Sequence, residues 1–301
     1  MPADLARPTE HDNLIKSRNL EIQVVDHCNL DCLGCSHDSP TMPPRGEDPG
    51  RLARTLSALW QYYRSPLVKL LGGEPLVHPR ISEIIRVVKT ETHAKVRLVT
   101  NGKLLAKRSS ALGEVDEVHI SVYPHVNVPS DGELVAIAKQ LGLSITLQQF
   151  NSFRWVRGKQ RGDDHLTERV YATCQMVHSW QCHTLRNGWI YPCPPAGTWG
   201  AGAQDGVSLL DDCESLRERL RALLHSSGPF HTCKSCLGSV GARYPHRLGA
   251  RSVPHSLHKG EVDFDFLRVL EKTPEADNSC FQYLRTILPN GDIVPGLPDD
   301  G

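Results

Sequence analysis

Three cysteines near the start of the chain constrain its fold and chemistry more than any other feature. Cys28, Cys32 and Cys35 have the spacing C-x3-C-x2-C and directly follow a predicted strand at residues 20–25. Three thiolates at this spacing can bind three irons of a cubane cluster, which usually takes four cysteines. The fourth iron would then stay open to a substrate or cofactor. Because short C-x2-C pairs are also typical of zinc sites, the spacing alone leaves a zinc knuckle open.

A second motif ends the next predicted strand, where residues 72–75 read Gly-Gly-Glu-Pro. The two glycines let a bound molecule approach the backbone closely, and the carboxylate of Glu74 can accept hydrogen bonds from an ammonium group. The two motifs in this order resemble the radical S-adenosylmethionine (SAM) superfamily. One position departs from the family pattern: Gly34 stands where an aromatic residue usually precedes the third cysteine.

The resemblance implies two cofactors, a [4Fe–4S] cluster and SAM, that meet at the open iron. It implies that the cluster is bound by Cys28, Cys32 and Cys35, and that the SAM-binding residues are Gly72, Gly73, Glu74, Asn101 and Ser121. One electron from the cluster would cleave the sulfonium of SAM. The resulting 5'-deoxyadenosyl radical would take a hydrogen atom from the substrate.

Strands and helices alternate along the first half of the chain. Apolar alternation predicts strands at residues 20–25, 67–71, 95–100, 117–123 and 143–150, with helices at 51–64, 80–91, 104–112 and 132–141. Strict alternation indicates parallel βα units with the reactive loops after the strands. The expected fold is α/β, a partial (β/α)6 radical SAM barrel whose sixth strand is not placed, followed by a small domain. The predicted division is residues 1–19, 20–165 and 166–301.

The two faces of the predicted strands differ in polarity. One set of alternating side chains is apolar and is expected to face the helices, whereas the opposite set includes Arg97, His119, Ser121 and Gln148. Burying so many polar groups is costly unless they are hydrogen-bonded. A hydroxyl-rich ligand in the lumen would satisfy them, although a solvated barrel bottom is the alternative.

Four more cysteines follow in the second half: Cys174, Cys193, Cys233 and Cys236. Gly188 is expected to turn a hairpin between the first two, and the last two form a C-x2-C pair, so the four fit one closed site. By spacing alone, zinc and an iron–sulfur cluster are both open. Behind a radical SAM barrel, the pattern resembles the Twitch domain, the one-cluster form of the SPASM domain, which implies an auxiliary [4Fe–4S] cluster on these four residues.

The cysteines outside this pattern suggest how the radical is used. Cys182 lies on the hairpin that must reach toward the barrel, whereas Cys280 begins a second Cys and glycine-turn pattern that lacks its final cysteine. Cys213 is expected to pack in a helix. Enzymes with the Twitch arrangement include dehydrogenases and epimerases of aminoglycosides and aminocyclitols. Cys182, as a hydrogen-atom donor, favours an epimerase that resembles the hygromycin B and neomycin type, with a dehydrogenase as the alternative.

Two other classes fit less well. Peptide-modifying SPASM enzymes commonly begin with a peptide-binding domain, for which the 19 residues before the first strand are too few. A non-catalytic iron–sulfur carrier would have no use for a SAM-binding motif. The expected partners are therefore a polar small molecule and an external reductant such as flavodoxin or ferredoxin.

Composition is consistent with this reading. The chain has 34 Lys and Arg against 34 Asp and Glu, and no basic tract that would indicate nucleic acid binding. No apolar run approaches the roughly 18 residues that span a membrane, and the N-terminus has no signal-peptide core. We therefore expect a cytoplasmic protein with reduced cysteines. Residues 151–164 are expected to be a basic linker, and residues 243–258 a surface loop.

Overall fold

The computed structural model describes residues 14–199, 204–211 and 215–296. Most of the predicted N-terminal extension, residues 1–13, and Cys213 therefore lie outside the described residues. The centre of the fold is a run of five parallel strands, paired in chain order: β2 (Leu20–Val25), β4 (Leu67–Gly72), β5 (Lys95–Thr100), β6 (Glu117–Val122) and β7 (Ser144–Phe150). This confirms the predicted α/β fold with a partial barrel of parallel strands.

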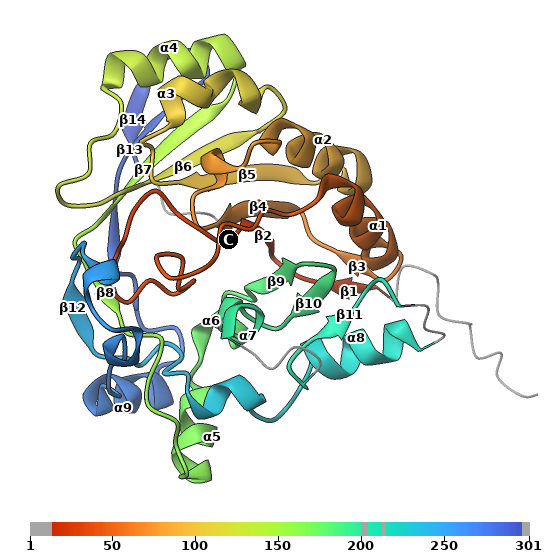
Figure 1. Ribbon diagram of the computed structural model, residues 1–301, viewed down its shortest axis with the longest axis vertical. Coiled ribbons are helices and arrows are strands. Elements are labelled where there is room, and N and C mark those ends of the chain that lie inside the picture. Colours follow the sequence, from red (N-terminus) through yellow and green to blue (C-terminus); the bar gives the residue numbers. More distant parts are fainter. Residues whose placement is uncertain (1–13, 200–203, 212–214, 297–301) are drawn as a thin grey trace, which may run out of the picture.

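Four helices connect these strands and lie along the outer side of the sheet (Figure 1): α1 (Pro49–Trp60), α2 (Ile81–Thr92), α3 (Leu105–Arg108) and α4 (Asp131–Leu141). The first helix starts earlier than predicted because Asp48 caps it, accepting the Arg51 N–H at 2.8 Å. A capping box of Ser130 and Glu133 begins α4, and Gly142 ends it in the left-handed conformation.

The second half of the chain extends the same sheet at both edges. On one side lie β9 (His183–Arg186), β10 (Trp189–Tyr191) and β11 (Val207–Ser208), with β9 parallel to β2. On the other side β13 (Phe281–Ile287) pairs antiparallel with β7, followed by β14 (Ile293–Pro295). The position next to β7, where a sixth parallel barrel strand was expected, is thus taken by an antiparallel strand from the end of the chain.

The predicted hairpin turns are confirmed. Asn187 and Gly188 both have positive φ, as a two-residue turn between β9 and β10 requires, and Gly291 has φ 90° between β13 and β14.

The remaining elements are short. Strands β1 (Ile15–Lys16) and β3 (Tyr63–Arg64) pair with each other, as do β8 (Ser152–Arg154) and β12 (Arg243–Pro245). The other helices are α5 (Asp164–Ala172), α6 (Gln175–His178), α7 (Pro194–Trp199), α8 (Leu216–Leu224), α9 (Phe264–Lys272) and the 3-10 turns η2 (Pro75–Val77), η3 (Ser109–Leu112), η5 (His231–Lys234), η6 (Ala250–Ser252) and η7 (His255–Leu257). In Figure 1, α5, α9, β8 and β12 lie on the side of the molecule away from α1 to α4.

The main core lies between the sheet and α1 to α4. The predicted helix-facing side chains are fully buried there, among them Ile22, Val96, Val118 and Ile145. A separate small core forms around α5 and α9, from Val170, Val240, Leu267 and Leu270. The predicted division of the chain at residue 165 stays a prediction. None of the helices in the described ranges is long and apolar enough to cross a membrane.

Candidate functional site

A cavity of about 1170 Å³ occupies the barrel. At the carboxyl ends of the strands its wall includes the three cysteines of the first motif, together with Gly72, Gly73, Asn101 and Ser121, as expected for the SAM site. At the amino ends of the strands the wall includes Lys69, Lys95 and Arg97. The wall thus includes Arg97 and Ser121 of the predicted polar set but not His119 or Gln148, and many of its other side chains are apolar. Most of the predicted SAM-site residues share this one cavity.

The three cysteines of the loop are present as thiols shielded from water. Burial raises the pKa of Cys28 to about 11 and also raises the pKa of Cys32 and Cys35. Without iron these side chains are protonated at neutral pH, and binding of a cluster would replace the protons. The Asn101 amide lies beside this loop, since its Nδ2 donates to Asn29 Oδ1 at 2.7 Å and lies 3.7 Å from Cys28 Sγ.

The glycines of the second motif hold the cysteine loop through close backbone contact. The Gly73 N–H donates to the Val25 carbonyl at 2.8 Å, and the next N–H donates to the His27 carbonyl at 3.1 Å. A Cβ on Gly73 would overlap the His27 carbonyl and lie 3.0 Å from the Cys28 nitrogen. Gly72 has φ +134°, and its Cβ would overlap the Val25 carbonyl. Only glycine permits this approach of the two strand ends.

Glu74 is the one predicted SAM-site residue that does not line the cavity. Its side chain is fully buried, with Oε1 accepting from the Leu76 N–H at 3.0 Å and the Thr100 hydroxyl at 2.7 Å, and Oε2 accepting from the Asn101 N–H at 2.8 Å. Burial raises the pKa of this carboxyl group, and the hydrogen bonds oppose that rise. The structure thus uses Glu74 to join the ends of β4 and β5, and it places the backbone of Gly72 and Gly73 on the cavity wall.

Gly73→Ala is expected to reduce iron incorporation at the first cysteine loop, because the added methyl group pushes the His27–Cys28 backbone away. Iron and sulfide analysis after anaerobic reconstitution would measure the loss. Gly132→Ala is the matched control, since a Cβ at Gly132 meets nothing within 4 Å. Equal iron content in both variants would contradict the close approach.

Glu74→Gln is expected to destabilise the apoprotein, because an amide NH2 would face a buried hydroxyl or backbone donor. Leaving such a donor unsatisfied costs about 1–3 kcal/mol. Urea unfolding monitored by circular dichroism would measure the free energy of unfolding. If Glu74→Gln left stability unchanged but weakened SAM binding, the carboxylate would instead be the direct SAM ligand that the motif predicts.

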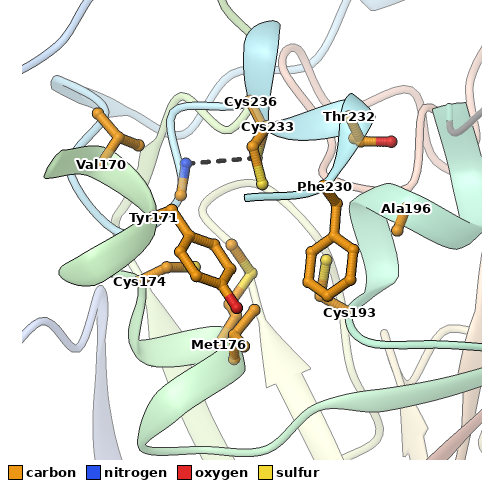
Figure 2. Close-up of a pocket in the computed structure, with 12 residues that line it drawn as sticks. Val170, Tyr171, Cys174, Met176, Cys193, Ala196, Phe230, Thr232, Cys233 and Cys236 are labelled. Carbon is orange, nitrogen blue, oxygen red and sulfur yellow. Dashed lines mark hydrogen bonds between the residues drawn. The ribbon is translucent and has the colours of Figure 1, made fainter. Parts of the chain in front are cut away.

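The four cysteines of the second set surround a common space. Cys174 precedes α6, Cys193 precedes α7, Cys233 lies in η5 and Cys236 follows it, and all four line one cavity (Figure 2). Figure 2 also shows the rings of Tyr171 and Phe230, which meet edge to face at 5.8 Å. In the described ranges, no three His, Cys, Asp or Glu side chains converge so as to hold a single metal ion. The structure thus brings the predicted four thiols together around a cavity.

The segment expected to be a solvated linker, residues 151–164, instead supports this cysteine cavity. Arg161 Nη2 donates to the Cys236 carbonyl at 2.7 Å and also to the Cys233 carbonyl. The Gly238 N–H donates to Cys236 Sγ at 3.3 Å, and Gly238 has the positive φ that this approach requires. Gly238 and Met176 line both this cavity and the barrel cavity, so the two adjoin.

Cys182 and Cys280 lie at opposite ends of the barrel strands. Cys182 directly precedes His183, which pairs with Leu20 at the amino end of β2. Cys280 directly precedes Phe281, which pairs with Phe150 at the carboxyl end of β7. Cys280 lines the barrel cavity, whereas Cys182 is buried beside its wall, with its N–H donating to the Met176 carbonyl at 2.8 Å.

Sequence reasoning missed a contact that covers the first cysteine loop. Residues 243–251, expected to be a surface loop, pair with β8 and then run along the loop, so that expectation is wrong for this segment. A Cβ on Gly34 would overlap the Tyr244 hydroxyl and lie 2.8 Å from the Trp155 ring. The one sequence signal of this contact was the absence of an aromatic residue at Gly34. The side chains of Trp155 and Tyr244, from later in the chain, fill the space beside it.

Comparison with known proteins supports the resemblance to the radical SAM superfamily. Residues 22–123 match the family model of the Radical SAM superfamily. A probable GTP 3',8-cyclase from Methanocaldococcus jannaschii is 30% identical over 151 residues, or 44% of this chain and 49% of that protein. The GTP 3',8-cyclase of Aquifex aeolicus is 32% identical over 150 residues, or 42% of this chain and 45% of that protein. The chain thus spans about half the length of these relatives.

Among solved structures, BtrN in complex with AdoMet and 2-DOIA is similar, with a TM-score of 0.45 and 15% identity over 73% of this chain and 92% of that chain. The matched segment, residues 22–123, belongs to the radical SAM superfamily of enzymes. The cofactors of this superfamily are a [4Fe–4S] cluster and SAM. The cavity that contains Cys28, Cys32 and Cys35 fits both, because one buried and two half-buried thiols share it with the glycine backbone of residues 72 and 73.

Proposed function

We propose that this protein is a radical SAM epimerase that inverts a carbinol centre of an aminoglycoside or aminocyclitol. When bound, SAM and its cluster supply the 5'-deoxyadenosyl radical that removes the carbinol hydrogen. The resulting carbon radical must then receive a hydrogen atom on its other face. The observation that carries the proposal is a buried thiol, Cys182, at the end of the barrel strands opposite the cysteine loop.

Cys182 is kept in the protonated state that a hydrogen-atom donor needs. Burial and the nearby Glu21 carboxylate, to which the thiol donates a hydrogen bond, raise the pKa of Cys182 well above its usual value. The thiol therefore carries its hydrogen at neutral pH. Cys280 has a raised pKa too, but it lies at the carboxyl ends of the strands with the cysteine loop, so it faces the substrate from the same end as SAM.

The cavity favours a substrate with many hydroxyl or amino groups. Asn19, Gln175 and Asn278 are buried residues of its wall whose amide NH2 groups donate to backbone carbonyls at 2.8–3.1 Å. Since a carbonyl only accepts, this orientation of each amide is fixed. Among the described residues their amide oxygens have no hydrogen-bond partner. These oxygens are shielded from the cavity, so a ligand would pair them only if the wall shifted, and the polar groups of the wall that favour a hydroxyl-rich ligand directly are those of Lys69, Arg97 and Ser121.

The second cysteine cavity supports an auxiliary cluster. A zinc ion binds four thiolates with each sulfur about 2.3 Å from the metal, whereas a cubane cluster needs a larger space between the four sulfurs. Cys174, Cys193, Cys233 and Cys236 line one cavity of about 20 Å³, which would have to widen to hold a cubane. The cavity adjoins Met176, whose carbonyl accepts the Cys182 N–H. A cluster here would be placed to return an electron to Cys182 after the thiol has given up its hydrogen atom, and a proton from solvent would complete the thiol. An external reductant such as flavodoxin or ferredoxin would supply the electrons.

Two alternatives predict different products. A dehydrogenase would lose a proton from the carbon radical, pass the electron to the auxiliary cluster and form a ketone. Similarity to GTP 3',8-cyclases favours a second candidate, cyclisation of GTP, although it covers about half of those proteins. A peptide-modifying enzyme would act on a ribosomal peptide, for which we find no supporting observation in the described residues.

Anaerobic reconstitution is expected to give about eight irons per chain, because two sets of thiolates support two cubanes. Replacing Cys28, Cys32 and Cys35 by alanine should leave about four irons and abolish SAM cleavage. Replacing Cys233 and Cys236 should also leave about four. Mössbauer spectra with iron and zinc analysis would make the measurement, and four irons in the wild type or stoichiometric zinc would contradict the auxiliary cluster.

The epimerase is tested by solvent deuterium. Incubation of the reduced wild type with SAM and a panel of aminoglycosides in D2O should place one deuterium at the inverted carbon for each 5'-deoxyadenosine formed, because the Cys182 thiol exchanges to S–D. Cys182→Ala should still form 5'-deoxyadenosine but should accumulate the oxidised ketone. Mass spectrometry and NMR of the products would distinguish these results.

Cys280→Ala is the matched control, since it removes a thiol that lines the barrel cavity near its other end. If Cys182→Ala still inverts the centre and Cys280→Ala does not, Cys280 is the donor. Ketone from the wild type would establish the dehydrogenase, and turnover of GTP in place of any aminoglycoside would establish the cyclase.

A further inference from the structure

The first cysteine loop is held from outside by a segment of the second half of the chain. The Leu33 N–H donates to the Arg247 carbonyl at 2.9 Å, and the N–H groups of Gly249 and Ala250 donate to the Asp31 carbonyl at 3.1 and 2.9 Å. The Tyr244 hydroxyl donates to the Leu33 carbonyl at 2.9 Å. Residues 243–251 therefore fix the backbone of the loop between its cysteines.

Within this segment, one side chain reaches a sulfur atom. His246 is buried, and its Nε2 lies 3.2 Å from Cys32 Sγ. The ring stacks on Tyr123 with centroids 4.7 Å apart and meets Phe153 edge to face at 5.0 Å. The His246 backbone N–H donates to the Asn151 carbonyl at 3.0 Å. Backbone and ring are thus both held, so the imidazole has little freedom to leave the sulfur.

The chemistry of the pair fixes which atom donates. A thiolate that binds iron has no proton, so only the N–H of His246 can donate in this contact. The reduced cluster carries one more negative charge than the oxidised cluster, and hydrogen bonds to the ligating sulfurs are one of the factors that set its potential. A donor on sulfur stabilises the more negative state.

We propose that His246 tunes the SAM-binding cluster by donating a hydrogen bond from Nε2 to Cys32 Sγ, which raises the reduction potential of that cluster. His246 acts through the cluster ligand and is a positioning and tuning residue. The proposal is independent of the reaction proposed above, because one-electron reduction of the cluster precedes any radical SAM chemistry. It joins the second half of the chain to the electronic properties of the first.

The test compares two amides of different reach at position 246. The terminal nitrogen of Gln can replace imidazole Nε2, whereas the nitrogen of Asn corresponds to Nδ1 and stops short of the sulfur. The measurement is the midpoint potential of the cluster whose electron paramagnetic resonance signal changes on addition of SAM, in the otherwise unmodified chain after reconstitution. His246→Gln should retain a midpoint close to the wild type, and His246→Asn should lower it.

Losing one hydrogen bond to a charged sulfur should change the ratio of reduced to oxidised cluster about tenfold at a fixed potential, which is about 59 mV for one electron. Tyr244→Phe is the control, since it removes a bond from the same segment to the loop backbone but none to sulfur. Its midpoint should not change. Iron content is measured for every variant.

Three results would overturn the proposal. An unchanged midpoint in His246→Asn at full iron content would show that the contact does not tune the cluster. An equal fall in Tyr244→Phe would show that the segment acts by holding the loop. An equal fall in His246→Gln and His246→Asn would show that the ring stack, and not the donated bond, is responsible. If His246→Asn binds less iron, His246→Phe, which keeps an aromatic ring on Tyr123, replaces it in the same comparison.

Discussion

The close approach of two strand ends, β2 and β4, determines where the chemistry of this protein lies. Gly73 contacts the His27 carbonyl with no room for a side chain, and the fully buried Glu74 joins this point to the end of β5 through Thr100 and Asn101. The loop that follows β2 must therefore start directly beside the glycine backbone. Three thiols and a bare backbone wall thus come to share one cavity, although the two motifs are about forty residues apart in the sequence.

The second half of the chain completes this site in addition to carrying four cysteines of its own. It supplies β13 at the open edge of the barrel, and residues 243–251 cover the first cysteine loop. Its cysteine cavity lies next to the barrel cavity through Met176 and Gly238. The barrel without the second half would lack a wall, the cover of its cysteine loop and the segment that holds Cys182.

The sequence was sufficient where local spacing determines structure. The five parallel strands, the helices between them and the turn at Gly188 follow from periodicity and turn chemistry, and the structure has them with small shifts at their ends. It was insufficient where contacts are distant in the chain. No local pattern indicates that β13 would pair antiparallel with β7, or that His246 would meet Cys32 across 214 residues. The hydrogen bonds of Glu74 to Thr100 and Asn101 were also not predicted. A motif specifies residue types, but not the groups from which a buried carboxylate accepts its hydrogen bonds.

The positions of Cys182 and Cys280 illustrate how topology limits chemistry. A hydrogen donor must face the side of the substrate opposite the atom that removed its hydrogen, and strand direction assigns the sides here. All five central strands run toward the cysteine loop, so a residue at the amino end of β2 lies at the opposite end of the barrel from that loop, while one at the carboxyl end of β7 lies at the same end. Because β9 pairs parallel with β2, Cys182 lies at the amino ends of the strands, away from the cysteine loop. An antiparallel β9 would have placed Cys182 at the same end as the loop. In the proposed epimerase, the direction of β9, which lies between β10 and β2, would therefore decide which face of the substrate a thiol can reach.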